Sequence, residues 1–225
     1  MLRRLPVEDN GSPAGSTVKR LLDMVASVIL LVPALPLIFI LGLLVRLDSR
    51  GPAFYVAERL GRNGRIFKMY KLRTMKHLPA AEGNGLPLTH AGDLRTTGLG
   101  RLLRRIKADE LPQIINVVKG DMSFVGPRPE DPFFLPCLGE HAGVLLSCRP
   151  GITGPASIEF SNEEAMLSNK STIEHYVKFI LPKKVALDLT YIDNWSLATD
   201  MKIIAGTLTM PFRRMKEKRI NNQLN

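Results

Sequence analysis

The sequence predicts a mainly α-helical fold with one small β-hairpin and an N-terminal re-entrant membrane helix. Three observations support this class. Residues 24–45 form a run of 22 positions without a charge, residues 53–73 alternate around an Asn-Gly pair, and apolar residues recur at helical spacing in several later segments. The uncharged run indicates a membrane, and the alternating segments are the only predicted strands.

Composition limits the classes of partner. The 225 residues suffice for one sizeable domain or two small ones, and 45% of them are hydrophobic. The net charge of +10 indicates an anionic partner: nucleic acid, an anionic membrane or a phosphorylated substrate. We expect no nucleic acid, because the sequence lacks an aromatic RNA-binding cluster, zinc-finger spacing and a basic region with heptads. The spacing of Cys137 and Cys148 fits neither CxxC nor a disulfide framework, which favours a reducing cytosolic face.

The uncharged run at 24–45 is long enough to cross a membrane. At 1.5 Å per residue it spans roughly 33 Å as a helix. A signal peptide is disfavoured, because the run is too long, starts too far from the N-terminus and lacks a cleavage site of small residues. A buried helix of a soluble protein is disfavoured, because such helices seldom stay apolar on every face.

Two prolines near the middle of this run, Pro33 and Pro36, predict a break in the helix. A spanning helix normally has more positive charge on one flank than on the other. Here both flanks are basic: Arg3, Arg4, Lys19 and Arg20 come before the run, and Arg46, Arg50, Arg59, Arg62 and Arg65 come after it. We therefore predict a re-entrant hairpin with both ends in the cytoplasm. A kinked single span is the alternative.

A basic β-hairpin is expected next, with strands at 53–56 and 66–73 joined by a tight turn at Asn63-Gly64. Such a hairpin is more often a solvated or lipid-facing surface than a catalytic element. Lys71 and Arg73 on the second strand are nevertheless candidate phosphate ligands.

The remaining segments alternate between loop and helix. Residues 77–97 are rich in Gly and Pro and read as a loop. Apolar patterns predict helices at 133–146, at 162–184 with an end or interruption at Pro182, and at 200–208. The four histidines show no metal-ligand spacing.

Residues 109–130 contain the strongest functional signal. Asp109 occupies the position of a helix N-cap, Glu110 and Pro112 fall in the first turn, and Gly120 ends the helix. The positive end of the helix dipole favours an ionised Asp109 and a nearby phosphate. The simpler alternative is that Asp109 serves only as a cap.

Cations around this stretch weaken the capping alternative. Residues 101–107 contain four basic side chains, Arg128 lies between Pro127 and Pro129, and Arg149 precedes another tight turn. The prolines restrict the backbone, so little entropy is lost when the Arg128 guanidinium binds a phosphate. A carboxylate that attacks a phosphate needs cations or a divalent metal to neutralise the phosphoryl oxygens. The pattern therefore predicts a site for a negatively charged substrate.

Taken together, these segments resemble the bacterial sugar transferases, the monotopic phosphoglycosyl transferases that prime glycan assembly on polyprenyl phosphate. The resemblance covers residues 19–210 and is most specific in the string Asp-Glu-Leu-Pro-Gln…Gly-Asp-Met-Ser-Phe-Val-Gly-Pro-Arg-Pro. The matching segments are 19–23, 61–64, 70–75, 109–130, 149–154 and 193–196.

The resemblance implies a two-step reaction that depends on Mg²⁺. Asp109 would attack the β-phosphate of a nucleotide diphosphate sugar, usually a UDP-sugar and here of the N-acetylhexosamine type. UMP would leave, and polyprenyl phosphate would then take the phosphosugar from the aspartate. Glu110 would hold the metal with Asp109 or handle a proton, while Arg104, Arg128 and Arg149 would bind phosphates. The product would initiate a surface polysaccharide or glycoconjugate, such as exopolysaccharide, lipopolysaccharide, capsule or glycoprotein.

The resemblance also implies an organisation and a location. A flexible N-terminus (1–18) would precede the membrane helix–break–helix (19–47), a cytosolic catalytic domain at the membrane surface (48–212) and a basic tail (213–225). The location would be the cytoplasmic face of the bacterial inner membrane, in contact with its lipid. The sequence is compatible with a monomer or a homo-oligomer.

The chain departs from the family pattern at two places. Leu35-Pro36 stands where many members have Ser-Pro in the membrane helix, and residues 155–160 lack the Trp-Ala-Gln that often follows the position of Gly154. Two alternative functions are a non-catalytic membrane-surface protein and a metal-dependent phosphohydrolase. The phosphohydrolase would need more clustered acidic or histidine metal ligands than the sequence contains.

Overall fold

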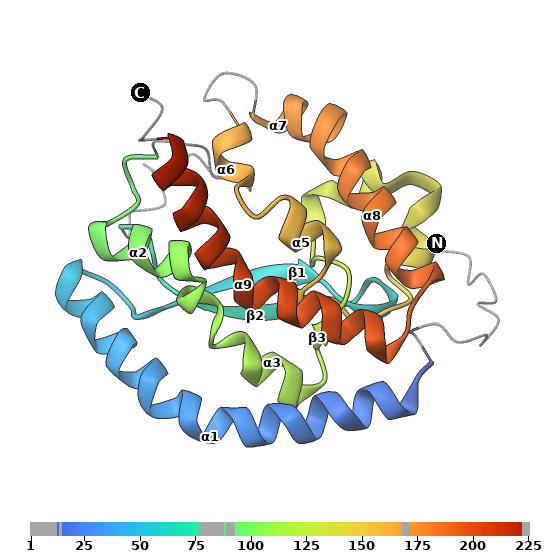
Figure 1. Ribbon diagram of the computed structural model, residues 1–225, viewed down its shortest axis with the longest axis horizontal. Coiled ribbons are helices and arrows are strands. Elements are labelled where there is room, and N and C mark those ends of the chain that lie inside the picture. Colours follow the sequence, from blue (N-terminus) through green and yellow to red (C-terminus); the bar gives the residue numbers. More distant parts are fainter. Residues whose placement is uncertain (1–12, 14, 77–87, 89–92, 168–171, 222–225) are drawn as a thin grey trace.

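The computed structural model describes residues 13, 15–76, 88, 93–167 and 172–221, and in this part of the chain helices surround two small sheets (Figure 1). The mainly helical prediction with a β-hairpin is confirmed. The helices are α1 (Thr17–Asp48), α2 (Gly98–Ile106), α3 (Gln113–Lys119), α4 (Ala142–Leu145), α5 (Pro155–Glu159), α6 (Glu163–Met166), α7 (Thr172–His175), α8 (Leu181–Asp193) and α9 (Leu197–Asn221). The strands are β1 (Phe54–Leu60), β2 (Ile66–Leu72), β3 (Ser123–Val125) and β4 (Gly151–Thr153).

Helix α1 contains the uncharged run. The Ser16 side chain caps it by accepting a hydrogen bond from the Lys19 backbone N–H at 3.1 Å. The helix continues through Pro33 and Pro36, and Figure 1 shows two limbs that meet at an angle. The predicted break is therefore a bend: the prolines remove two backbone donors, while the surrounding hydrogen bonds keep the helix continuous.

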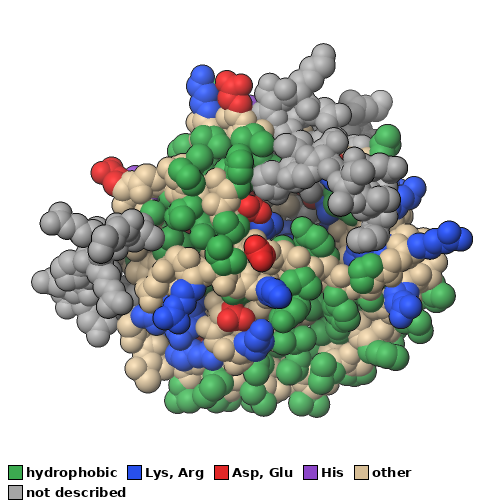
Figure 2. All heavy atoms as spheres, turned by 180° about the vertical axis from the view of Figure 1, so that it is seen from behind, with side chains coloured by type: hydrophobic (Ala, Val, Ile, Leu, Met, Phe, Trp, Pro, Cys, Tyr) green, Lys and Arg blue, Asp and Glu red, His purple; other side chains and the backbone are tan. Residues whose placement is uncertain are grey.

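One stripe of α1 packs against the rest of the protein, and its other faces are exposed and apolar. The buried stripe consists of Lys19, Asp23, Ser27, Ala34, Ile38, Gly42 and Val45. Figure 2 shows hydrophobic side chains along the lower edge, where α1 lies. With 32 residues and a mean hydropathy of 3.0 in its most apolar window, α1 is the one helix among the described residues that is suited to a membrane.

Both ends of α1 are fixed to the same body. Near its start, Lys19 forms a buried ion pair with Asp200 at the beginning of α9. Near its end, the Arg73 guanidinium donates to the backbone carbonyls of Val45 and Ser49. The helix therefore lies along the domain, as Figure 1 shows, with α3 between these two attachments.

The hairpin pairs β1 and β2 in antiparallel register from Phe54↔Leu72 to Leu60↔Ile66. The first strand is longer than predicted. The connection at 61–65 contains a short 3₁₀ turn in which Asn63 and Gly64 both have positive φ (58° and 72°), so the Asn-Gly pair does form the turn.

A second sheet was not predicted: β3 and β4 are parallel, and three residues each are too few for a clear sequence pattern. The backbones approach so closely that a Cβ on Gly151 would lie 2.2 Å from the Gly126 nitrogen. This pairing brings the turn that carries Arg128 beside residues 149–151.

Helix boundaries in the second half differ from the prediction. Residues 132–141 form 3₁₀ turns that contain Pro136 and are kinked at Gly139, which has a non-helical conformation, and only Ala142–Leu145 is α-helical. A π-helical turn at Tyr176–Ile180 leads directly into α8, and Pro182 lies in the first turn of α8, where its missing N–H is tolerated, instead of ending a helix. The predicted loop at 77–97 falls largely outside the described residues.

Candidate active site

The Asp109–Glu110 pair lies on a single 3₁₀ turn, Ala108–Glu110, between α2 and α3. Lys107 precedes it in the left-handed conformation with φ of 60°, which turns the chain sharply. The prediction that Asp109 caps α3 is wrong. Pro112 occupies the cap position and α3 begins at Gln113, so the Asp109 side chain is not used for capping.

Asp109 is buried, with 7% of its surface exposed, and its Oδ1 has no hydrogen-bond partner among the described residues. Burial, followed by the charge of Glu110, raises the pKa of Asp109 above its usual value, although Lys71 and Lys107 oppose the shift. From the sequence we expected the helix dipole and the neighbouring cations to favour the ionised form of Asp109, but in the structure the effect of burial on its pKa is larger. A more basic carboxylate is a better nucleophile once it is ionised.

Glu110 has the opposite environment. Its Oε1 lies 3.1 Å from the Lys71 ammonium on β2. Burial acts to raise its pKa, yet Lys71, Lys107 and Arg128 lower the pKa of Glu110 to about 2. The two adjacent carboxylates thus differ: Glu110 is paired and firmly ionised, whereas Asp109 keeps an unpaired oxygen.

Three predicted cations lie around this pair. Lys71 contacts Glu110, and Arg104 on α2 acts electrostatically on Asp109. Arg104 also donates from Nε to the Thr74 hydroxyl at 2.8 Å and pairs with Glu164 on α6. The charge of Arg128 acts on Glu110, and the part of the chain that the structure describes offers its guanidinium no hydrogen bond or ion pair.

Two predicted phosphate ligands lie elsewhere. Arg73 directs five hydrogen bonds to the last turn of α1 and the segment that follows it, with acceptors on Val45, Ser49, Arg50 and Pro52. All of its donors are occupied, so the expectation that Arg73 is free to bind phosphate is corrected to a structural role.

Arg149 also lies away from the carboxylate pair, and its phosphate-binding role stays a prediction. It donates from Nε to the Gly120 carbonyl at 2.9 Å, at the end of α3 opposite the carboxylate pair, and its charged neighbours include Arg20 and Arg62. A cation at this end of a helix satisfies terminal carbonyls and complements the dipole. The structure therefore does not group Arg149 with Asp109.

Lys107 is a further site residue, which was not predicted individually from the sequence. Burial lowers the pKa of Lys107, and the positive charges of Arg128 and Lys71 add to this effect, while Glu110 and Asp109 oppose it. The lysine was part of the cationic run at 101–107, but its left-handed backbone beside the pair could not be predicted from that run.

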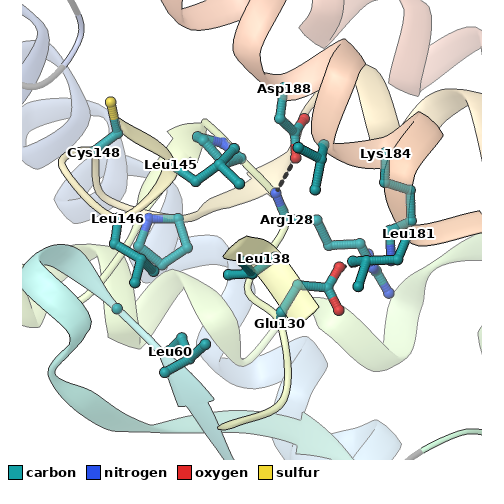
Figure 3. A pocket seen from close by; sticks show the side chains of 14 residues that line it. Leu60, Arg128, Glu130, Leu138, Leu145, Leu146, Cys148, Leu181, Lys184 and Asp188 are labelled. Atoms are coloured by element: carbon teal, nitrogen blue, oxygen red, sulfur yellow. Dashed lines mark hydrogen bonds and ion pairs between the residues drawn. The ribbon is translucent and has the colours of Figure 1, made fainter. Parts of the chain in front are cut away.

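A polar cluster around the buried Lys184, whose glutamates act electrostatically on Arg128, was also not predicted. The Lys184 ammonium lies 2.7 Å from Glu130 and 3.2 Å from Glu163, and it donates to the Tyr176 hydroxyl at 2.6 Å. The Tyr176 hydroxyl in turn donates to Glu130 at 2.7 Å. Figure 3 shows Arg128, Glu130 and Lys184 converging on one side of a pocket whose other walls are largely apolar.

Asp188 lies one turn after Lys184 on α8. Its Oδ2 accepts the Arg128 backbone N–H at 3.1 Å, as the dashed line in Figure 3 marks. Burial raises the pKa of Asp188 to about 7. Lys184 and Asp188 are spaced i, i+4 within a largely apolar helical pattern, and this spacing could have indicated that both lie on one functional face of α8.

The described residues contain no group of three or more His, Cys, Asp or Glu side chains that could enclose a metal. The Asp109–Glu110 pair supplies two carboxylates, one with an unpartnered oxygen. Mg²⁺ commonly binds through one or two carboxylates, several waters and substrate phosphates, so these residues fit a metal ion shared with a substrate.

Comparisons with known proteins decide the family. A family model described as "Bacterial sugar transferase" matches residues 14–214. The chain belongs to this family. One relative is the UDP-glucose:undecaprenyl-phosphate glucose-1-phosphate transferase of Caulobacter vibrioides, 37% identical over 194 residues, which are 84% of this chain and 68% of that protein.

Two further relatives show the range of the bacterial sugar transferases. The UDP-N-acetylgalactosamine-undecaprenyl-phosphate N-acetylgalactosaminephosphotransferase of Aeromonas hydrophila is 34% identical over 88% of this chain and 44% of its own length. The exopolysaccharide production protein PSS of Rhizobium leguminosarum bv. phaseoli is 33% identical over 88% of this chain and 97% of its own length. The chain is therefore an enzyme, a phosphoglycosyl transferase.

Proposed function

We propose that this sugar transferase moves a phosphosugar from a UDP-sugar to polyprenyl phosphate, yielding polyprenyl diphosphate sugar and UMP. The observation that carries the proposal is that, among the described residues, both the buried Asp109 Oδ1 and the Arg128 guanidinium lack a hydrogen-bond partner, while the charge of Arg128 acts on the adjacent Glu110. The names of the relatives from Caulobacter and Aeromonas support the polyprenyl acceptor.

In the proposed first step, an Asp109 carboxylate oxygen attacks the β-phosphorus of the donor. The bond from this phosphorus to the oxygen that bridges to the α-phosphate breaks, and UMP leaves with that oxygen. Arg128 and Lys107 neutralise the phosphoryl oxygens, because a carboxylate cannot approach an uncompensated phosphate. The Lys71–Glu110 pair holds the turn that carries Asp109.

In the second step, a phosphate oxygen of the polyprenyl phosphate attacks the same phosphorus. The bond to Asp109 breaks, a diphosphate forms, and the carboxylate is regenerated. Asp109 and Glu110 are the residues proposed to hold Mg²⁺, which would supply charge neutralisation to the donor's diphosphate.

We place the enzyme on the cytoplasmic face of the bacterial inner membrane, with α1 re-entrant. Support comes from the two attachments of α1 to one domain, at Lys19 and near Val45. A helix of about 48 Å whose two ends are held by the same body has no free end to carry across a bilayer. Its exposed apolar side chains are then buried in one leaflet.

For the donor we propose a UDP-N-acetylhexosamine, in line with the Aeromonas relative, and for the pathway the initiation of a surface polysaccharide or glycoconjugate. UDP-glucose is the competing donor, because the Caulobacter relative is named for it. The non-catalytic alternative, a membrane-surface binding protein, predicts no turnover of any donor.

The test is an incubation of the purified protein with Mg²⁺ and a panel of UDP-N-acetylglucosamine, UDP-N-acetylgalactosamine, UDP-glucose and UDP-galactose. We expect multiple turnovers of UMP with undecaprenyl phosphate present, and about one UMP per enzyme without it. Release of UDP instead of UMP would show transfer of the sugar alone and overturn the proposal. Absence of turnover with every donor would favour the binding protein.

A further inference from the structure

Three carboxylates interact electrostatically with the Arg128 guanidinium, but none of them forms an ion pair with it. Burial opposes the charged form, but Glu110, Glu163 and Glu130, in decreasing order, raise the pKa of Arg128. An arginine whose charge is stabilised by three glutamates would normally form a bidentate ion pair with one of them. Among the described residues, Arg128 does not.

Each of the three carboxylates is instead bound by a lysine. Glu110 is paired with Lys71 at 3.1 Å. Glu130 and Glu163 are both paired with Lys184, at 2.7 Å and 3.2 Å. The acceptors that compete for the Arg128 guanidinium are therefore already occupied.

Lys184 is built for this role. Only 2% of its surface is exposed, and its ammonium has three acceptors: Glu130, Glu163 and the Tyr176 hydroxyl. It lies on α8, one turn before Asp188, whose carboxylate holds the Arg128 backbone N–H. A buried lysine with this set of partners needs no substrate contact to be satisfied.

We infer that Lys184 is a positioning residue that keeps Glu130 and Glu163 away from Arg128, so that the Arg128 guanidinium stays available for the donor's phosphate. This inference rests on the proposed phosphate-binding role of Arg128. The physical reason is the cost of an unpaired charge that is partly removed from water. Without Lys184, Glu130 and Glu163 would lose their cation, and the charge of Arg128 already acts on both of them.

The role predicts an asymmetry between the two partners of the Lys184–Glu130 ion pair. Lys184→Met leaves Glu130 and Glu163 free to capture Arg128, so kcat/KM for the donor falls about tenfold or more, mainly through KM. Glu130→Gln removes a competitor of the phosphate and has a smaller effect. Adding Glu130→Gln and Glu163→Gln to Lys184→Met removes both competitors and restores kcat/KM to within about threefold of wild type.

An ion pair that serves only stability predicts the reverse. Lys184→Met and Glu130→Gln would then lower activity in parallel with the melting temperature, and the triple variant would be no better than the worst single variant. Lys184→Arg retains the charge and should retain most of the donor affinity. Lys183→Met, at the exposed neighbour on α8, is the matched control.

The assay is UMP release with UDP-N-acetylgalactosamine and with UDP-glucose, each in the presence of undecaprenyl phosphate, together with thermal unfolding of every variant. If wild type turns over neither donor, the proposed function fails before the inference is tested by kcat/KM. In that case the inference is decided by binding of UMP to wild type and variants, which should follow the same order. An active wild type with an equally active Lys184→Met enzyme would overturn the inference alone.

Discussion

Lys71 and Glu110 form an ion pair of 3.1 Å that joins the second strand of the hairpin to the turn that carries Asp109. The contact spans 39 positions in sequence and fixes which of the two adjacent carboxylates is paired. Glu110 is held in its charged form by lysines and Arg128, and Asp109 is left with an unpartnered oxygen. The chemistry proposed for the pair depends on this difference.

Asp109→Asn should abolish activity while the protein still folds and stays with the membrane. The amide has the same size, and the native side chain caps no helix, but an amide cannot form the acyl phosphate. Mass spectrometry of wild type quenched after exposure to UDP-sugar alone should show a phosphosugar adduct on the peptide that contains Asp109. An adduct on another residue, or turnover by Asp109→Asn, would contradict the assignment.

Lys107→Asn should weaken donor binding without a large change in stability. Asparagine tolerates the left-handed backbone at this position but removes the charge beside Asp109 and Glu110. We expect the donor KM to rise about five- to tenfold, as for loss of one charged phosphate contact. The exposed Lys119→Asn variant is the control, and equal KM values for the two variants would argue against a phosphate contact.

Arg73→Lys should destabilise the protein rather than change its affinity for the donor. A lysine cannot replace five hydrogen bonds to the end of α1 and the segment after it, so we expect a loss of about 2–4 kcal/mol in unfolding free energy. Denaturant unfolding measures the change, with the exposed Arg65→Lys as the comparison. A folded Arg73→Lys enzyme with a raised donor KM would return Arg73 to the phosphate site.

Asp188 should make stability depend on pH. Its pKa is about 7 in the folded protein and 3.8 at its usual value, so the folded state binds the proton more tightly. Stability therefore falls as pH rises from about 4 to about 7, by at most about 4 kcal/mol. Asp188→Asn still offers Arg128 an acceptor but does not titrate, so its unfolding free energy should be flatter across this window. An unchanged slope would show that Asp188 titrates normally.

Re-entrant topology predicts that both termini face the cytoplasm. In a Cys137→Ser background, in which the buried Cys148 is the remaining native cysteine, a cysteine introduced near residue 10 or near residue 215 should resist a membrane-impermeant thiol reagent in intact cells. Both should react after the cells are opened. Labelling of only the N-terminal cysteine in intact cells would instead support a kinked single span.

Local patterns in the sequence determined the elements that short-range physics controls. The uncharged run became α1, alternation around Asn63-Gly64 became the hairpin, and Gly120 ended α3 with φ of 89°. Residues 109–130 also contain the most specific resemblance to the family. The Asp109–Glu110 pair could be predicted from them, because adjacent residues stay adjacent in any fold.

Only the tertiary structure decided which cations face that pair. Arg73, Arg128 and Arg149 are equivalent as sequence letters, since a guanidinium binds a backbone carbonyl and a phosphate with the same donors. Arg73 and Arg149 donate to carbonyls, whereas the Arg128 guanidinium has no hydrogen-bond partner among the described residues, and lysines pair with the carboxylates around it. The lysine that occupies two of them, Lys184, is 54 positions from Glu130, and no local pattern specifies a contact that distant packing creates.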